Sequence, residues 1–189
     1  MPAPQRKSVS LLDTATSSAA VKKPVMDVDK VFGKKTVADI KKGLSNLNIE
    51  YVKVGFFDID GILRGKYMKV EKFVSALDNG FGFCDVVMGW DSNDQLYDSA
   101  KYTGWHTAYP DAEVRIVTES VRAIPFEDNI PFFICELAGK GETVCPRGLL
   151  KRVIDRAHDM GFVPYTACEF EFFMFDETPE TIREIGFKF

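Results

Sequence analysis

The sequence predicts an α+β fold built in two parts, and three observations support this prediction. Residues 51–57 and 62–68 are rich in apolar and aromatic residues and flank an Asp/Gly turn, which is typical of a β-hairpin. Apolar residues recur at helical spacing before this pair, in residues 37–47, and after it, in residues 70–77. A proline-initiated helical pattern then begins at Pro146, so a further part of the fold starts there.

The composition fits a folded protein and excludes several classes. Of the 189 residues, 46% are hydrophobic and 13% aromatic, which is enough for a real core. The net charge of -4 leaves no basic footprint, so nucleic acid is not expected as a partner. No apolar run approaches the roughly 18 to 20 residues of a membrane span, and no membrane partner is expected.

The four cysteines, at positions 84, 135, 145 and 168, form no Cys-x-x-Cys pair, so neither a zinc site nor a disulfide framework is indicated. Reduced thiols in a cytoplasmic protein fit this pattern. Residues 1–35 are expected to form a disordered N-terminal arm. Residues 1–24 are rich in Ser, Ala, Thr and Lys, so an organelle transit peptide is the alternative for that stretch.

The predicted first domain covers residues 36–141. Thr36 is a candidate N-cap for a helix that ends near Asn48. The hairpin follows, and then a helix stopped by Asn79-Gly80.

The rest of that domain combines a long loop with two strands. Residues 81–110 are full of Gly, Asp, Asn, Ser and Tyr, and loops of this length inside compact domains are usually functional. Strands are expected at 113–118 and 131–137, and Gly139-Lys140-Gly141 closes the domain.

The predicted second part covers residues 142–189. Its helix runs over residues 146–160 and ends at Gly161. Strands are expected at 162–167 and 168–176. One helix with two strands cannot close a core, so we expect this part to be only the beginning of a domain.

Glu169 and Glu171 interrupt the apolar run of the last predicted strand. Two residues apart on a strand they face the same way, with stems about 6.6 Å apart. A buried carboxylate needs a compensating cation. Arg or Lys partners, an exposed strand end, or divalent metal ions would each satisfy these glutamates, and ion pairs are the commonest solution.

Asp58-Ile59-Asp60-Gly61 follows an apolar strand, as does the nucleophile motif of haloacid dehalogenase-type phosphatases. The alternating strands and helices and the later lysine and acidic pair of that class are absent from the sequence pattern. A tight hairpin turn is the favoured interpretation, and the phosphatase is a remote alternative.

Several segments occur in a particular order along the chain. They are residues 57–66 (Phe-Asp-Ile-Asp-Gly-Ile-Leu-Arg-Gly-Lys), Tyr109-Pro110-Asp111-Ala112, Cys145-Pro146-Arg147 with Leu150-Lys151-Arg152, Gly161, and residues 168–175 (Cys-Glu-Phe-Glu-Phe-Phe-Met-Phe). Together they resemble the N-terminal part of the glutamine synthetase family, over residues 48–176. The helix that opens with Pro-Arg and the Glu-x-Glu-Phe-Phe strand are the most specific parts of the match.

The resemblance implies an N-terminal domain of β-grasp type, followed by the start of a catalytic domain with a curved antiparallel sheet. It implies an ATP-dependent ligase that uses Mg²⁺ or Mn²⁺ and joins ammonia or an amine to the γ-carboxylate of glutamate through a γ-glutamyl phosphate. Glu169 and Glu171 match two metal-ligand glutamates of the family. Homo-oligomers with active sites shared between subunits are also implied.

In the family an Asp on a long loop holds ammonium, and the match places this role on Asp91. The usual Asp-Gly-Ser-Ser is Asp91-Ser92-Asn93-Asp94 here, so Asp85 and Asp94 remain rivals, and a turn-forming Asp in a solvated loop remains the alternative. Ammonia and a larger amine both stay open as acceptors.

The family's metal-binding His and its ATP- and glutamate-binding arginines lie downstream of the Glu-x-Glu strand. The 189-residue chain alone is therefore expected to be inactive. A truncated or non-catalytic structural relative is the alternative function.

Overall fold

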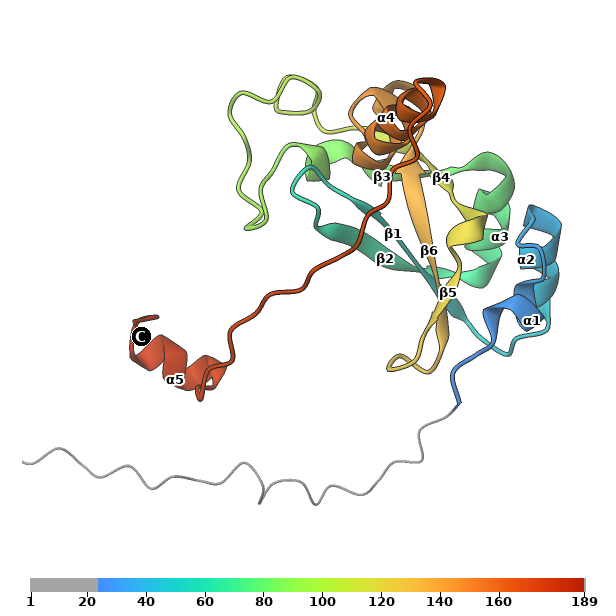
Figure 1. Ribbon diagram of the computed structural model, residues 1–189, viewed down its shortest axis with the longest axis horizontal. Coiled ribbons are helices and arrows are strands. Elements are labelled where there is room, and N and C mark those ends of the chain that lie inside the picture. The colour runs from blue at the N-terminus through green and yellow to red at the C-terminus, as the bar shows by residue number, and fades with distance from the viewer. Residues whose placement is uncertain (1–23, 189) are drawn as a thin grey trace, which may run out of the picture. The chain divides into compact units, whose positions relative to one another are not determined.

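The computed structural model describes residues 24–188 (Figure 1). The chain forms two compact units. The first unit ends at Arg152 and the second begins at Val153. The sequence placed the domain boundary at residue 141, and that assignment stays a prediction. None of the helices in residues 24–188 has the length and apolarity needed to cross a membrane.

The first unit is a mixed α/β structure around one curled sheet. Its elements are α1 (Val28–Phe32), α2 (Val37–Ser45), β1 (Tyr51–Phe57), β2 (Leu63–Lys69), α3 (Val70–Asn79), β3 (Phe81–Cys84), η1 (Asp85–Met88), β4 (Asp111–Ile116), η2 (Thr118–Ser120), β5 (Arg122–Ile124), β6 (Ile130–Leu137), η3 (Gly139–Thr143) and the beginning of α4 (Pro146–Asp159).

The strand order of the sheet is β2-β1-β6-β4-β3, and β5 pairs with β6 beside this path. The central strands β1 and β6 are parallel, and the other pairs are antiparallel. Lys66 on β2 donates from Nζ to the carbonyl of Gly82 on β3, at 3.4 Å. Because β2 and β3 are the two ends of the strand order, this contact shows that the sheet curls and brings its edges together.

The predicted hairpin is confirmed. Strands β1 and β2 pair in register from Tyr51 with Lys69 to Phe57 with Leu63. The turn between them uses Gly61 at φ +76°, a conformation that glycine adopts without steric cost. Local turn chemistry therefore sets the register of this edge of the sheet.

The helices of residues 36–48 and 70–79 are also confirmed. Thr36 and Asp39 form a reciprocal capping box at the start of α2. Helix α3 ends at Gly80, whose amide donates to the carbonyl of Ala76. Both helices contribute to the same core, as Ile40 and Phe73 are fully buried.

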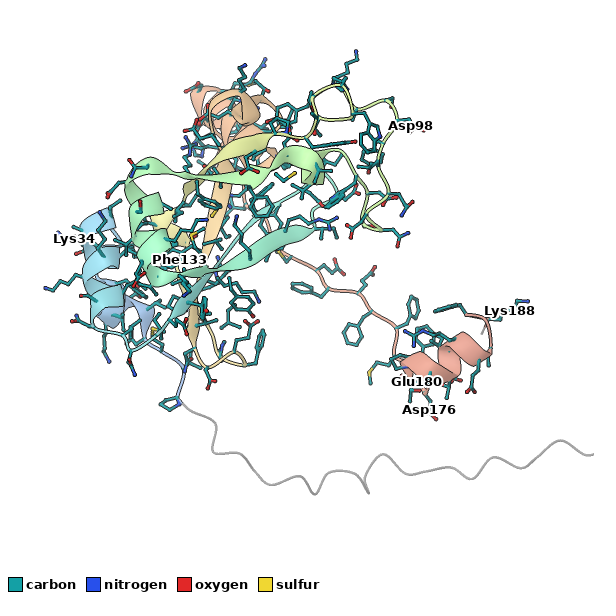
Figure 2. All side chains as sticks on the ribbon, turned by 180° about the vertical axis from the view of Figure 1, so that it is seen from behind. Lys34, Asp98, Phe133, Asp176, Glu180 and Lys188 are labelled. Carbon is teal, nitrogen blue, oxygen red and sulfur yellow. The ribbon has the colours of Figure 1, made fainter. Side chains whose placement is uncertain are left out.

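Part of the predicted N-terminal arm is folded. Helix α1 lies within the expected disordered stretch, and Phe32 at its end is fully buried, with its ring 6.3 Å from that of Phe133. Phe133 on β6 also packs against Phe73, and Figure 2 labels it among the side chains of the first unit. The prediction of an arm over residues 24–35 is wrong because burial of Phe32 holds this stretch against the core. Residues 1–23, with the transit-peptide alternative, lie outside the described residues.

The long predicted loop is partly ordered into regular elements. Strand β3 and the 3₁₀ helix η1 occupy its first residues, and β3 pairs with β4 from Phe81 with Val114 to Cys84 with Asp111. The predicted strands near 113–118 and 131–137 correspond to β4 and β6, and β5 between them was not predicted. Strands as short as β3 and β5 lack a periodic signal, because their partner strands define them.

The helix predicted for residues 146–160 is confirmed, but the prediction for the residues after it is wrong. Helix α4 ends at Asp159, and Gly161 takes φ +83°. Residues 162–175 are exposed and form no helix or strand, and they pair with no strand among the described residues, so the strands predicted at 162–167 and 168–176 are not formed. A strand needs a ladder partner, and the remaining element of the second unit is a helix, α5 (Pro179–Glu184).

Candidate functional site

The turn between β1 and β2 is organised by Asp58, whose side chain is fully buried. Its Oδ1 accepts the backbone amides of Asp60 and Ile62, each at 2.9 Å. Its Oδ2 accepts Nε of Arg64 at 2.7 Å. Both carboxylate oxygens are therefore engaged, so Asp58 is a turn residue and not an available nucleophile. This geometry opposes the phosphatase alternative.

Arg64 connects this turn to the long loop. Its Nη1 donates to Oδ1 of Asp94 at 2.6 Å, and its Nη2 donates to the main-chain carbonyl of Asp91 at 3.0 Å. The guanidinium also lies over the ring of Trp90, 5.2 Å from its centroid. The hydrogen bond to Asp58, followed by that to Asp94, raises the pKa of Arg64 above its ordinary value.

Asp91 lies at the start of a tight turn in this loop. Its Oδ1 accepts the amides of Asn93 and Gln95, at 2.8 and 2.9 Å, and the side chain is half-buried. An isolated bridge pairs Trp90 with Leu96 on either side of the turn. Oδ2 of Asp91 has no hydrogen-bond partner within residues 24–188. The carboxylate thus stabilises a local turn through Oδ1 and leaves Oδ2 available to bind a cation. This arrangement fits a turn-forming aspartate and an ammonium-binding aspartate, the two interpretations that the sequence left open.

The two rivals of Asp91 are engaged differently. Asp94 is exposed, with a positive φ of 58°, and its carboxylate pairs with Arg64. Asp85 in η1 is buried, and its Oδ1 accepts the hydroxyl of Thr103 at 2.5 Å. Asp94 is thus paired with a cation and Asp85 is buried, whereas Asp91 is half-buried and pairs with no cation among the described residues.

The other side of the loop is tied to the same turn. The amide of Tyr97 donates to the carbonyl of Gly89 at 2.8 Å, and its hydroxyl donates to Oδ2 of Asp60 at 3.2 Å. Burial raises the pKa of the Tyr97 hydroxyl, and the carboxylate of Asp60 adds to this effect. The hydroxyl therefore stays protonated as a donor at neutral pH.

Glu169 and Glu171 lie in the second unit, where both are exposed on the segment of residues 162–175, which has no regular secondary structure. Within residues 24–188 no three His, Cys, Asp or Glu side chains are grouped to hold a metal ion. The two carboxylates are oxygen donors of the kind that Mg²⁺ and Mn²⁺ prefer, but two ligands are fewer than such ions require. They fit part of a metal site, and the structure gathers no further ligands around them.

The Pro-Arg start of α4 has a structural contact of its own. Arg147 donates from Nε to Oε1 of Glu136 on β6 at 3.1 Å, and Arg115 donates to Oε2 at 3.0 Å. The side chain of Glu136 is only 11% exposed, so it needs these cations. The beginning of the family's helix motif is thereby attached to the sheet of the first unit.

The sequence proposed Asp91 in the long loop as the acceptor-binding residue, which stays a prediction, and it gave no sign of the contact between Arg64 and Trp90. Arg64 belongs to the segment 57–66, yet its partner residues in the loop lie about 30 positions later in the chain. The hairpin pattern predicts that Arg64 lies opposite Phe56, but it does not predict a contact with a distant loop. Such a contact depends on the curl of the sheet, which the spacing of residues in the sequence does not indicate.

Comparisons with known proteins agree with the motif series. The family model described as glutamine synthetase, catalytic domain, matches residues 143–187. The chain is 43% identical over 140 residues to type-1 glutamine synthetase 2 of Dictyostelium discoideum, covering 72% of this chain and 27% of that protein. It is 31% identical over 154 residues to the glutamate–isopropylamine ligase of a Pseudomonas species, covering 79% of this chain and 33% of that protein.

A third relative, the gamma-glutamylethanolamide synthetase of Streptomyces coelicolor, is 26% identical over 145 residues, which are 75% of this chain and 31% of that protein. Among solved structures, the cryo-EM Plasmodium falciparum glutamine synthetase aligns with a TM-score of 0.49 at 17% identity, over 67% of this chain and 23% of that one. The chain spans a third or less of the length of the three curated relatives.

Proposed function

Because the chain belongs to the glutamine synthetase family, we propose that it is the N-terminal part of an ATP-dependent ligase that joins ammonia or an amine to the γ-carboxylate of glutamate through a γ-glutamyl phosphate. The observation that carries this proposal is the 43% identity over 140 residues with a type-1 glutamine synthetase. Relatives named for isopropylamine and ethanolamide chemistry support a choice of acceptor between ammonia and a short amine.

The topology of the first unit supports a β-grasp assignment for its N-terminal domain. A hairpin, β1 and β2, is followed by α3, and the last long strand, β6, returns parallel to β1 at the centre of the sheet. The match of residues 143–187 to the catalytic-domain family supports the start of a second domain near residue 142. Cysteine usage supports a cytoplasmic location.

In the proposed mechanism Asp91 binds the acceptor as its ammonium form and helps it to lose a proton. The free oxygen of its half-buried carboxylate supports this role. Glu169 and Glu171 would hold a divalent metal ion, which when bound neutralises charge on the transferring phosphoryl group. ATP and glutamate are the proposed co-substrates, and a homo-oligomer in which one subunit supplies Asp91 to its neighbour's site is the proposed assembly.

The test is ligase turnover of the protein expressed from its complete gene, with ammonium, isopropylamine and ethanolamine as acceptors. Asp91→Asn is expected to lower kcat/KM for the preferred acceptor by about hundredfold or more. Glu169→Gln and Glu171→Gln are expected to raise the Mg²⁺ concentration needed for half-maximal rate. Asp98→Asn, an exposed loop carboxylate that Figure 2 labels, is the matched control and should change neither value.

Undiminished turnover in Asp91→Asn would refute its role in acceptor binding, and unchanged metal dependence in both Glu variants would refute the metal assignment. A complete protein that releases no phosphate from ATP in the presence of glutamate would favour the non-catalytic structural relative.

A further inference from the structure

The Asp58–Gly61 turn and Arg64 have no direct part in the proposed chemistry, yet the turn is built with unusual completeness. Asp58 is fully buried and uses one oxygen for two backbone amides and the other for Arg64. The amide of Asp58 donates to the carbonyl of Ile62, and the amide of Gly61 donates to the carbonyl of Asp58. These hydrogen bonds make the turn rigid, and the hydrogen bond that Arg64 donates to Asp58 fixes the orientation of the guanidinium.

Arg64 uses a different nitrogen for each of its three partners. Nε faces the buried Asp58, Nη1 faces Asp94, and Nη2 faces the carbonyl of Asp91. The guanidinium is planar and presents these donors in fixed directions, whereas the single ammonium of a lysine would not reach all three acceptors at once. The Arg64 side chain is 15% exposed and Asp58 is fully buried, so the contact to Asp58 is shielded from competing water, whereas the partner carboxylate of Asp94 is 59% exposed.

The contacts on the loop side surround Asp91. Trp90 lies against the guanidinium on one side of Asp91 in sequence, and Asp94 binds it on the other. The carbonyl of Asp91 itself accepts from Nη2, which fixes the peptide plane from which the side chain extends. Tyr97 and Asp60 hold the returning strand of the loop to the same hairpin turn.

From this arrangement we propose that Arg64 is a positioning residue: it holds the loop of residues 90–94 so that the free carboxylate oxygen of Asp91 keeps one orientation for the acceptor. The proposal rests on the proposed function, because it gives Asp91 the acceptor. The motif that resembled a phosphatase nucleophile then has a different use. Asp58 orients Arg64, and Arg64 orients the acceptor loop.

The first experiment measures loop order in the 189-residue chain, without substrates. Trp105 is 83% exposed, so Trp105→Phe leaves Trp90 as the single indole reporter. In this background, Arg64→Gln and Asp94→Asn are compared by Trp90 fluorescence and by amide hydrogen exchange at Asn93 and Gln95, the donors to Asp91. Asp94→Asn leaves the Asp58–Arg64 pair intact, so it tests the loop contact even if Arg64→Gln unfolds the chain.

We expect Arg64→Gln to accelerate exchange at Asn93 and Gln95 by about tenfold or more, because charge-assisted hydrogen bonds are lost. Asp94→Asn should give a smaller acceleration at the same two amides. Both variants should shift Trp90 emission to longer wavelength. Arg122→Gln is the matched control, because the Arg122 side chain is exposed and, among residues 24–188, donates to a main-chain carbonyl alone, that of Ser120, at 3.3 Å.

Exchange that stays at the control level at both amides, or that rises equally over the whole sheet, would overturn the positioning role and leave Arg64 as the counter-ion of Asp58 alone. In the complete protein, Arg64→Lys should raise KM for the acceptor while KM for ATP stays constant, and equal changes in both would also overturn it. Because hydrogen exchange in the loop is measured without turnover, it can support or overturn the positioning role even if the protein proves to have no ligase activity.

Discussion

Replacing Phe32 with alanine tests whether residues 24–35 belong to the folded domain. Phe32 is fully buried, and its ring meets that of Phe133 edge-on at an interplanar angle of 71°. The ring also covers Gly43 in α2, where an added Cβ would clash with it. Phe32 thus fills the space between α1, α2 and β6.

The expected loss follows from this packing. Removing a buried phenylalanine ring costs about 3–5 kcal/mol, and we expect a value near 3 kcal/mol because the short helix α1 can shift toward the gap. A domain of this size has a free energy of unfolding of about 5–15 kcal/mol, so the loss is a large fraction of it. With a urea dependence of about 1–3 kcal/mol per molar, the midpoint should fall by about 1 M or more.

The assay is urea unfolding of the 189-residue chain, followed by circular dichroism. Phe126→Ala is the matched control, because that ring is 87% exposed and its loss should change the free energy of unfolding by less than about 0.5 kcal/mol. Equal midpoints for the two variants would refute the packing argument and restore the disordered arm over residues 24–35. A fall in the urea dependence, with the midpoint unchanged, would mean that α1 detaches before the sheet unfolds.

Three further predictions concern ion pairs and thiols. Glu127 binds a lysine Nζ and a tyrosine hydroxyl, each at 2.6 Å, and chiefly the lysine holds its pKa below the ordinary 4.5. The stability that Glu127 contributes is therefore complete above about pH 4.5 and is lost as the pH falls through the lower pKa of the folded state. Glu127→Gln should thus weaken the dependence of the urea midpoint on pH below about 5, and an unchanged dependence would contradict the pairing. Burial raises the pKa of the Cys135 thiol to about 12, so iodoacetamide at about pH 8 should modify the exposed Cys168 in the folded chain and leave Cys135 free, as read by peptide mass spectrometry; early modification of Cys135 would show that the core opens. Arg147→Gln removes one of two cations from the buried Glu136 and should lower the free energy of unfolding by about 1 kcal/mol, and an unchanged thermal midpoint would show that the second arginine suffices.

The hairpin and the helices α2 and α3 were predictable because their signals are local. The Asp/Gly turn, the capping box at Thr36 and the stop at Gly80 each involve residues a few positions apart. Helix α1 was missed because it has five residues, and only the long-range burial of Phe32 shows that it belongs to the fold. A helix this short is not stable by itself.

The strands predicted for residues 162–176 failed for the complementary reason. Alternating apolar residues indicate a preference for extended structure, but residues 162–175 form neither helix nor strand. Pairing depends on a neighbouring strand, and the described part of the second unit contains none. Glu169 and Glu171 therefore stand on an exposed segment, and their role stays a prediction.

By itself the sequence determined the order of the local elements, the turn at Asp58 and the family resemblance, because turns, caps and motifs depend on residues close together in the chain. The role of Asp91 stays a prediction. Only the tertiary structure decided that β1 lies parallel to β6, that Phe32 is part of the core, and that Arg64 holds the loop of Asp91. These contacts join residues far apart in the chain, and their geometry depends on how the whole sheet curls, which no local pattern encodes.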